Sequence, residues 1–160
     1  MKTNIRALAA FFTLAWTGLI LAGPDPASGV AKGTYAAPGE KTPATLTNAA
    51  AFVDEKDDQK PIILICSDKK LPTEKWTSEF DLMESDSDLK FSGVVFWINP
   101  KDGSVIRSDT YWKGHPASVG GYFEIKLDPI KGKDLTGSAH TTSTDADAPK
   151  LDVTFHAVLR

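Results

Sequence analysis

The sequence has one cysteine, Cys66, among 160 residues. A single cysteine cannot form an intramolecular disulfide, so stability must come from packing. The sequence also lacks the spacing motifs of zinc sites. Its three histidines, His115, His140 and His156, lie far apart, and neither C-x-x-C nor H-E-x-x-H occurs. These absences disfavour disulfide-rich folds and zinc-dependent enzymes.

Runs of basic residues are absent as well. The chain has 18 Lys and Arg against 21 Asp and Glu, a formal net charge of −3 at pH 7. Such a mildly acidic chain argues against nucleic acid or anionic membrane as the main partner. No G-x-S-x-G motif and no glycine cluster that opens a helix is present, which disfavours serine hydrolases and nucleotide binders.

Acidic residues are plentiful in the segments DEKDDQK and ESDSD, but neither segment has the ligand spacing of a calcium loop. Nothing in the sequence places two carboxylates across a cleft, as glycoside hydrolysis would need. We therefore predict no catalytic residue, no metal ligand and no cofactor.

The N-terminal segment, residues 1–29, has the order of a secretory signal peptide. Lys2 and Arg6 precede an apolar run, which ends at Pro24 and Pro26. The alternative is an uncleaved membrane anchor, because the run is only slightly shorter than the roughly 20 residues that span a bilayer. No stop-transfer charges follow, so we expect cleavage, export to the periplasm or the exterior, and no membrane span in the mature chain.

Residues 30–160 are long enough for a single domain with its own core. Short apolar segments separated by turn residues predict β-strands. The clearest is 151–159, where apolar and polar residues alternate. Segment 91–98 is apolar on both faces, which predicts a central strand. In the NPKDG turn that follows it, Gly103 is expected to be left-handed and to close a bulged hairpin.

The segment PIILIC raises the question whether Cys66 is a reactive thiol. On a strand, Ile62, Leu64 and Cys66 face one side, while Ile63 and Ile65 face the other. A cysteine in line with large apolar residues occupies a buried position, where thiol pKa is raised and reactivity is low. We predict a structural cysteine; the alternative is a nucleophile served by a histidine and a carboxylate.

Segments 30–37, 44–53, 122–127 and 134–142 complete the predicted strands, although the alanines of 44–53 would also suit a short helix. Strands at hairpin spacing without βαβ alternation predict an all-β fold. We expect an antiparallel β-sandwich or flattened barrel of about eight strands with one short helix.

That helix is predicted to begin at Thr73 as N-cap. Trp76, Phe80 and Met83 follow at helical spacing and would form its buried face. The acidic segment ESDSD, residues 84–88, is expected to be a solvated loop.

Aromatic residues supply the candidate ligand-binding site. In the segment TYWKGH, Tyr111 and Trp112 point to opposite sides of a strand end, so one of them should face outward. Flat rings give binding area at low entropic cost. The alternative is core packing, which we expect for Trp97 because it shares a face with Phe91 and Val95.

The pattern GTYAA, PIILICSDKKLP, DLTGSAHTT and LDVTFHAVLR resembles a loose group of small exported bacterial proteins, in which a signal peptide precedes a β-rich domain. That group has no assigned activity, so the resemblance implies no catalytic residue. We predict a monomeric, non-enzymatic module that binds an extracytoplasmic protein or small ligand through an edge strand or the Tyr111/Trp112 end. The alternative is a small hydrolase or metal-dependent enzyme built from scattered Asp and His residues.

Overall fold

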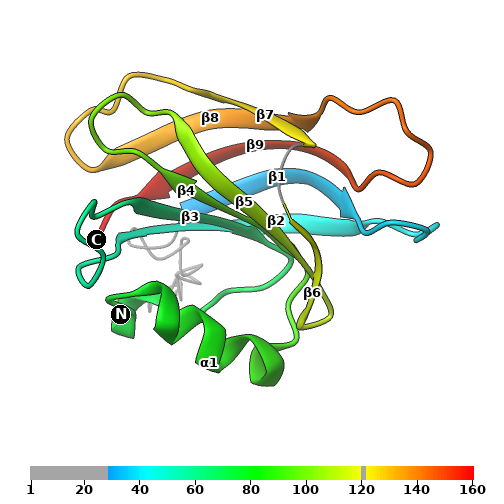
Figure 1. Cartoon of the computed structure of the whole chain (residues 1–160), viewed down its shortest axis with the longest axis horizontal. Helices are drawn as coiled ribbons and strands as arrows, with labels where there is room; N and C mark the ends of the chain where they lie inside the picture. The colour runs from blue at the N-terminus through cyan, green and yellow to red at the C-terminus, as the bar shows by residue number, and fades with distance from the viewer. Residues whose placement is uncertain (1–28, 120–121) are drawn as a thin grey trace, which may run out of the picture.

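The computed structural model describes residues 29–119 and 122–160, which form one curled antiparallel sheet with the shape of a half-barrel (Figure 1). The nine strands have the order β6-β5-β4-β3-β2-β1-β9-β8-β7. Their bounds are β1 Gly29–Ala36, β2 Ala44–Val53, β3 Ile62–Ser67, β4 Gly93–Ile98, β5 Val105–Trp112, β6 His115–Val119, β7 Phe123–Leu127, β8 Asp134–Thr141 and β9 Lys150–Val158. The predicted all-β class is confirmed, and β6 is a strand that the sequence did not predict.

The predicted signal peptide lies outside the described residues, apart from Gly29 at the start of β1. Within the described part of the chain, no helix has the length and apolar character to cross a membrane.

The concave face of the sheet encloses the main hydrophobic core. In β9 the alternation predicted from the sequence is confirmed, since Val153 and Phe155 are buried and Asp152 and Thr154 are exposed. The sheet curls far enough for Phe123 of β7 to meet Phe96 of β4, with ring centroids 6.3 Å apart in an edge-to-face contact. The largest fully buried side chains of this core are Tyr35, Leu46, Leu64, Phe96, Ile98 and Leu135.

Strands β3 and β4 are buried along their whole length, because the convex face of this part of the sheet is covered too. Their outward side chains form a second core, in which Ile65 and Trp97 lie with Leu82 of the helix α1 (Glu79–Leu89). Cys66 faces the main core with no exposed surface, and burial raises the pKa of its thiol to about 12. The predictions of a structural cysteine and of a buried Trp97 are confirmed.

The β4–β5 hairpin also forms as predicted. The Asn99 carbonyl accepts the N–H of Gly103 at 2.9 Å, and Gly103 has φ of +74°. The Asn99 N–H donates to the Ser104 carbonyl at 2.8 Å, so Gly103 and Ser104 lie opposite Asn99 as the expected bulge, and the pairing register shifts again between Trp97 and Ile98.

The predicted helix was wrong at both ends. Thr73–Lys75 is a single 3-10 turn, and the α-helix runs over Glu79–Leu89, including the segment expected to be a loop. Phe80 and Met83, expected to be buried, are each 57% exposed, whereas Leu82 is fully buried.

Hydrogen bonds at Asp81 explain the later start. Its carboxylate accepts the backbone N–H groups of Thr77 at 2.7 Å and Ser78 at 3.0 Å. This is the backward half of a capping box, and Ser78-x-x-Asp81 is the sequence signal for it. A second carboxylate, Asp54, accepts the Glu79 N–H at 2.9 Å. Trp76 stays extended before this cap and packs edge-to-face on Phe52.

Candidate binding groove at Trp112

Tyr111 and Trp112 lie on opposite faces of β5, as their spacing predicted, and they do not share a site. Tyr111 is only 5% exposed and stacks on Phe91 with ring centroids 4.9 Å apart, so it belongs to the core beneath the helix. Trp112 is half-buried on the concave side, where it meets Tyr35 edge-to-face at 5.9 Å. Of the two, Trp112 is the ring that lines an open groove.

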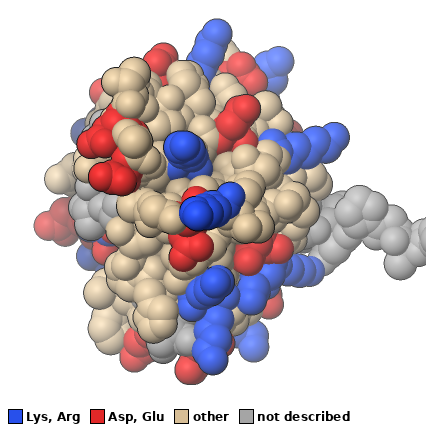
Figure 2. Space-filling model, turned by 90° about the vertical axis from the view of Figure 1, so that its right-hand side faces the viewer, with Lys and Arg blue, Asp and Glu red and all other residues tan. Residues whose placement is uncertain are grey.

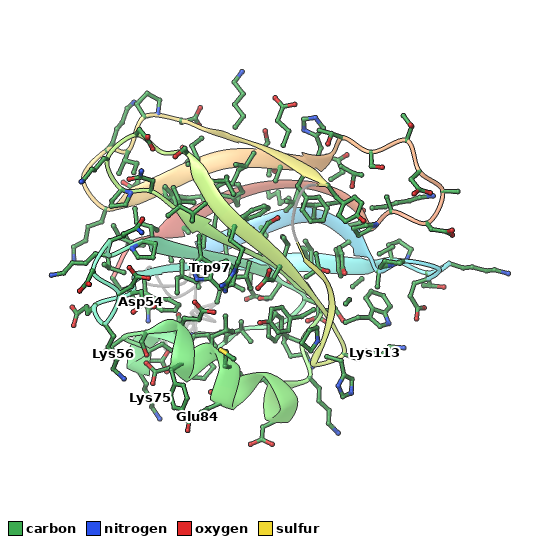
Figure 3. All side chains as sticks on the ribbon, in the orientation of Figure 1. Asp54, Lys56, Lys75, Glu84, Trp97 and Lys113 are labelled. Carbon is green, nitrogen blue, oxygen red and sulfur yellow. The ribbon has the colours of Figure 1, made fainter. Side chains whose placement is uncertain are left out.

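The groove beside Trp112 has a volume of about 500 Å³ and is built by four segments that are distant in the sequence. They are the loop before β2, the end of β3, the connection from α1 to β4, and the β5–β6 turn. Three cations and two carboxylates line it together with the indole: Lys69, Lys90, Lys113, Glu40 and Asp68. Figure 3 places Lys113 at the right-hand end of the molecule, and Figure 2, which views that end, shows Lys and Arg side chains gathered in its lower half.

Ser92 joins three of these segments. It is 3% exposed, and its N–H donates to Asp68 Oδ1 at 2.9 Å, while its carbonyl accepts the Asp68 N–H at 3.0 Å. Its hydroxyl oxygen accepts the backbone N–H of Lys113 at 3.1 Å. The adjacent Gly114 N–H donates to the Phe91 carbonyl at 2.8 Å. The backbones that carry the groove's lysines are therefore fixed relative to one another.

Two of the groove's lysines have a left-handed backbone. Lys90, directly after α1, has φ of +47°, and Lys113, in the two-residue β5–β6 turn with Gly114, has φ of +53°. Such turns favour Asn-Gly, and α-helices favour glycine at the position after their end. The left-handed conformation costs a residue with a Cβ atom about 1–2 kcal/mol. Lys60 has the same φ, +47°, in the loop before β3, away from the groove.

A second charged cluster lies between α1 and the convex face of the sheet. Arg107 stacks on Trp97 at 3.6 Å from the ring centroid and pairs with Glu79, and its Nε is 3.2 Å from Asp109 Oδ2. Burial raises the pKa of Asp109, and the charge of Arg107 partly offsets that effect. Because Glu79 begins α1, this cluster attaches the helix to β4 and β5, which is a structural role.

His140 and His156 lie on the outer face of the other half of the sheet, whereas His115 begins β6. His140 is opposite Asp152, and its Nε2 is 3.7 Å from Glu124 Oε2. His156 Nε2 is 2.8 Å from Asp134 Oδ1 beside an open depression. Over the described residues, no group of three or more His, Cys, Asp or Glu side chains is arranged to hold a metal ion.

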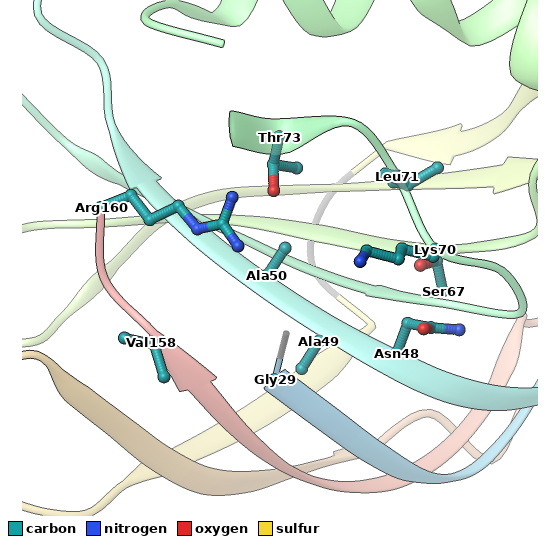
Figure 4. A pocket seen from close by; sticks show the side chains of 10 residues that line it. All are labelled: Gly29, Asn48, Ala49, Ala50, Ser67, Lys70, Leu71, Thr73, Val158 and Arg160. Atoms are coloured by element: carbon teal, nitrogen blue, oxygen red, sulfur yellow. The ribbon is translucent and has the colours of Figure 1, made fainter. Parts of the chain in front are cut away.

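A depression between the end of β9 and the segment after β3 is too small for a ligand. Lys70 and Arg160 point into it from opposite sides (Figure 4), and its volume of about 20 Å³ holds about one water molecule. The Nη1 atom of Arg160 is also 3.7 Å from Glu74 Oε2.

Comparison of the chain with protein-family models, with curated proteins and with solved structures finds no match. The resemblance to small exported bacterial proteins therefore stays a prediction, and the groove has to be interpreted from its own geometry.

Proposed function

We propose that the protein is an exported, non-enzymatic binding module that holds its ligand in the groove beside Trp112. The observation that supports this is the way the groove is built: four distant segments meet there, and Ser92 joins three of them by three hydrogen bonds to Asp68 and Lys113. A groove whose walls are fixed before the ligand arrives loses less entropy on binding.

The charged groups of the groove suit binding better than catalysis. One carboxylate oxygen of Asp68 is occupied by the Ser92 N–H, so it supports the groove's frame. The alternative, a hydrolase, would draw on His156 and Asp134. Their side chains are 53% and 57% exposed, so solvent screens both groups, whereas catalytic pairs are commonly tuned by burial.

Export is proposed from the order of basic, apolar and proline-containing stretches in residues 1–29. The intact mass of the protein recovered from an expressing bacterium tests it. A mass that lacks about 29 residues, in the periplasm or medium, is the expected result of signal cleavage. The full-length mass in the membrane fraction would support the uncleaved anchor instead.

A bulky side chain placed in the groove tests whether the ligand binds there. Thr42 is exposed and lines the groove, and Thr45 is exposed but lies outside it. We expect native mass spectrometry of protein purified without refolding to show a bound small molecule on the wild type and on Thr45→Trp, but not on Thr42→Trp. A bound molecule that survives in Thr42→Trp, or none on the wild type, would contradict the proposal.

A further inference from the structure

We infer that the groove beside Trp112 takes a sugar-sized ligand that carries at least two anionic groups. This inference names the ligand class of the proposed binding module and rests on that proposal. It is carried by the convergence of Lys69, Lys90 and Lys113 on one groove that also has an aromatic wall.

The charge of the groove has the opposite sign to that of the chain. Three lysines against Glu40 and Asp68 give the groove a formal charge of +1, whereas the whole chain has −3. The net negative charge of the whole chain disfavours a long polyanion, which would extend far beyond the groove. A short anionic ligand limits that repulsion and lies among the three lysines that line the groove.

The backbone of the groove retains strain that a glycine would relieve. Lys90 and Lys113 are both left-handed, and both reach the groove. Strained positions that the surrounding structure holds in place are concentrated at functional sites, and the inference runs from the observed outlier to the function. Lys60 is equally left-handed but lies elsewhere, so strain alone does not mark a site. The two groove lysines differ from it because they share a groove with Lys69 and Trp112.

The size and wall of the groove indicate a sugar-sized ligand. A volume of about 500 Å³ falls within the roughly 300–1,000 Å³ of small-molecule sites. The Lys113 ammonium lies over the Trp112 ring, 5.4 Å from its centroid, so the indole holds one of the three cations at the wall of the groove. A cation held over an aromatic wall, with two further lysines lining the same groove, suits a compact ligand that bears acid groups.

The first experiment is isothermal titration calorimetry of the protein, purified without refolding, with four probes of similar size. Digalacturonic acid presents carboxylates, a heparin disaccharide presents sulfates, fructose 1,6-bisphosphate presents phosphates, and cellobiose is neutral. We expect at least one anionic probe to bind and to lose several-fold in affinity between 50 and 200 mM salt, because charge pairs at an open site are screened. Comparison of the three anionic probes shows whether the groove prefers carboxylate, sulfate or phosphate. Tighter binding of cellobiose, or no binding of any anion, would overturn the inference.

Glycine substitutions separate binding from stability. We expect Lys90→Gly and Lys113→Gly each to weaken the anionic probe about tenfold, the size of one charge-assisted contact. Lys60→Gly should leave the affinity unchanged. Because all three remove a left-handed lysine, all three should retain or raise the midpoint of thermal unfolding, and a purely structural role for Lys113 predicts no change in binding. Equal weakening by Lys60→Gly would overturn the inference.

The two proposals fail in different ways. If Thr42→Trp removes the co-purified molecule while the lysine variants keep it, the groove binds a ligand that is not anionic, and only this inference fails. If the molecule survives in Thr42→Trp, the groove is not the site and the proposed function fails as well.

Discussion

The two halves of the sheet differ in what covers their outer faces. Strands β3 and β4 are buried at every position, because α1 covers their convex side. Strand β9 alternates between buried and exposed residues, with Asp152, Thr154 and His156 exposed on the outer face. Figure 1 shows the helix below one half of the half-barrel, and among residues 29–119 and 122–160 no helix lies against β8 and β9.

This difference decides where chemistry can be placed. In the half that is buried on both sides, side chains are apolar or form ion pairs that attach α1 to the sheet, such as Arg107 with Glu79. The open half has polar groups, but they are exposed to water. The groove at Trp112 lies at one end of the sheet, where the loop between β1 and β2 meets the turn after β5, so it combines an aromatic residue of the covered half with exposed lysines.

The sharpest test of the comparison is a pair of truncations at outward-facing positions. Ile65 of β3 is fully buried beneath the helix side, and Thr154 of β9 is exposed. We expect Ile65→Ala to lower the free energy of unfolding by about 2–5 kcal/mol, since it removes buried methyl groups and leaves a cavity. Thr154→Ala should change it by less than about 0.5 kcal/mol. Urea unfolding of both variants measures this, and equal costs would mean that the outer face of β9 is covered too.

Weakening the attachment of α1 should make the covered half of the sheet more similar to the open half in stability and in hydrogen exchange. Asp54 is 5% exposed, and its carboxylate accepts the Lys56 and Asp57 N–H groups and the Glu79 N–H at the start of α1. We expect Asp54→Ala to cost about 1–3 kcal/mol, because it leaves buried donors unpaired. Hydrogen exchange should also accelerate in α1 before it does in β9.

The matched control for this variant is Asp57→Ala. Asp57 accepts the Gln59 N–H at 2.7 Å on the surface, where water can replace it. Its loss should cost less than about 0.5 kcal/mol. If both variants cost the same, the attachment of the helix does not depend on Asp54.

Thiol chemistry gives a third contrast between the halves. Cys66 is fully buried in β3 with a pKa raised to about 12 by burial, so we expect it to react with a thiol reagent at pH 8 only after unfolding. The variant Cys66→Ala with Thr154→Cys moves the thiol to the outer face of β9, where it should be labelled in the native protein. Replacing Cys66 by alanine should itself cost about 1 kcal/mol. Fast labelling of Cys66 in the native wild type would contradict its burial.

Much of the fold could be predicted from the sequence because period-two alternation and two-sided apolar runs report burial directly. The faces of β3 and β9 were assigned correctly at each residue for this reason. The helix was misplaced because Trp76, Phe80 and Met83 fit a helical period, while the local hydrogen bonds of Asp81 decided where the helix begins. Helix propensity and hydrophobic period are weaker evidence for the start of a helix than the hydrogen bonds of such a cap.

The candidate site could be predicted only in part. Trp112 was found from its place at a strand end, and Tyr111 proved to be core. The lysines of the groove come from three separate segments, so the sequence has no run of basic residues from which the groove could be predicted. Their convergence depends on Ser92, a residue whose role follows from tertiary contacts alone.

The smallest expected effect concerns pH and the helix cap that maintains the covered half. The pKa of Asp81 is lowered, first by the hydrogen bond from the Thr77 N–H and also by those from Ser78. A carboxyl group whose pKa is lower in the folded state stabilises the fold above its unfolded pKa of about 4, and this contribution is lost as pH falls through the lower, folded value. Asp81→Ala should therefore cost about 0.5–1 kcal/mol at pH 7, the lower end for a helix cap because the group is partly exposed, and less at pH 2. Urea unfolding between pH 2 and 7 measures the difference, with Glu84→Ala as control for the loss of a charge on the same helix. A cost that stays constant over this range would show that Asp81 acts by its shape and not by its charge.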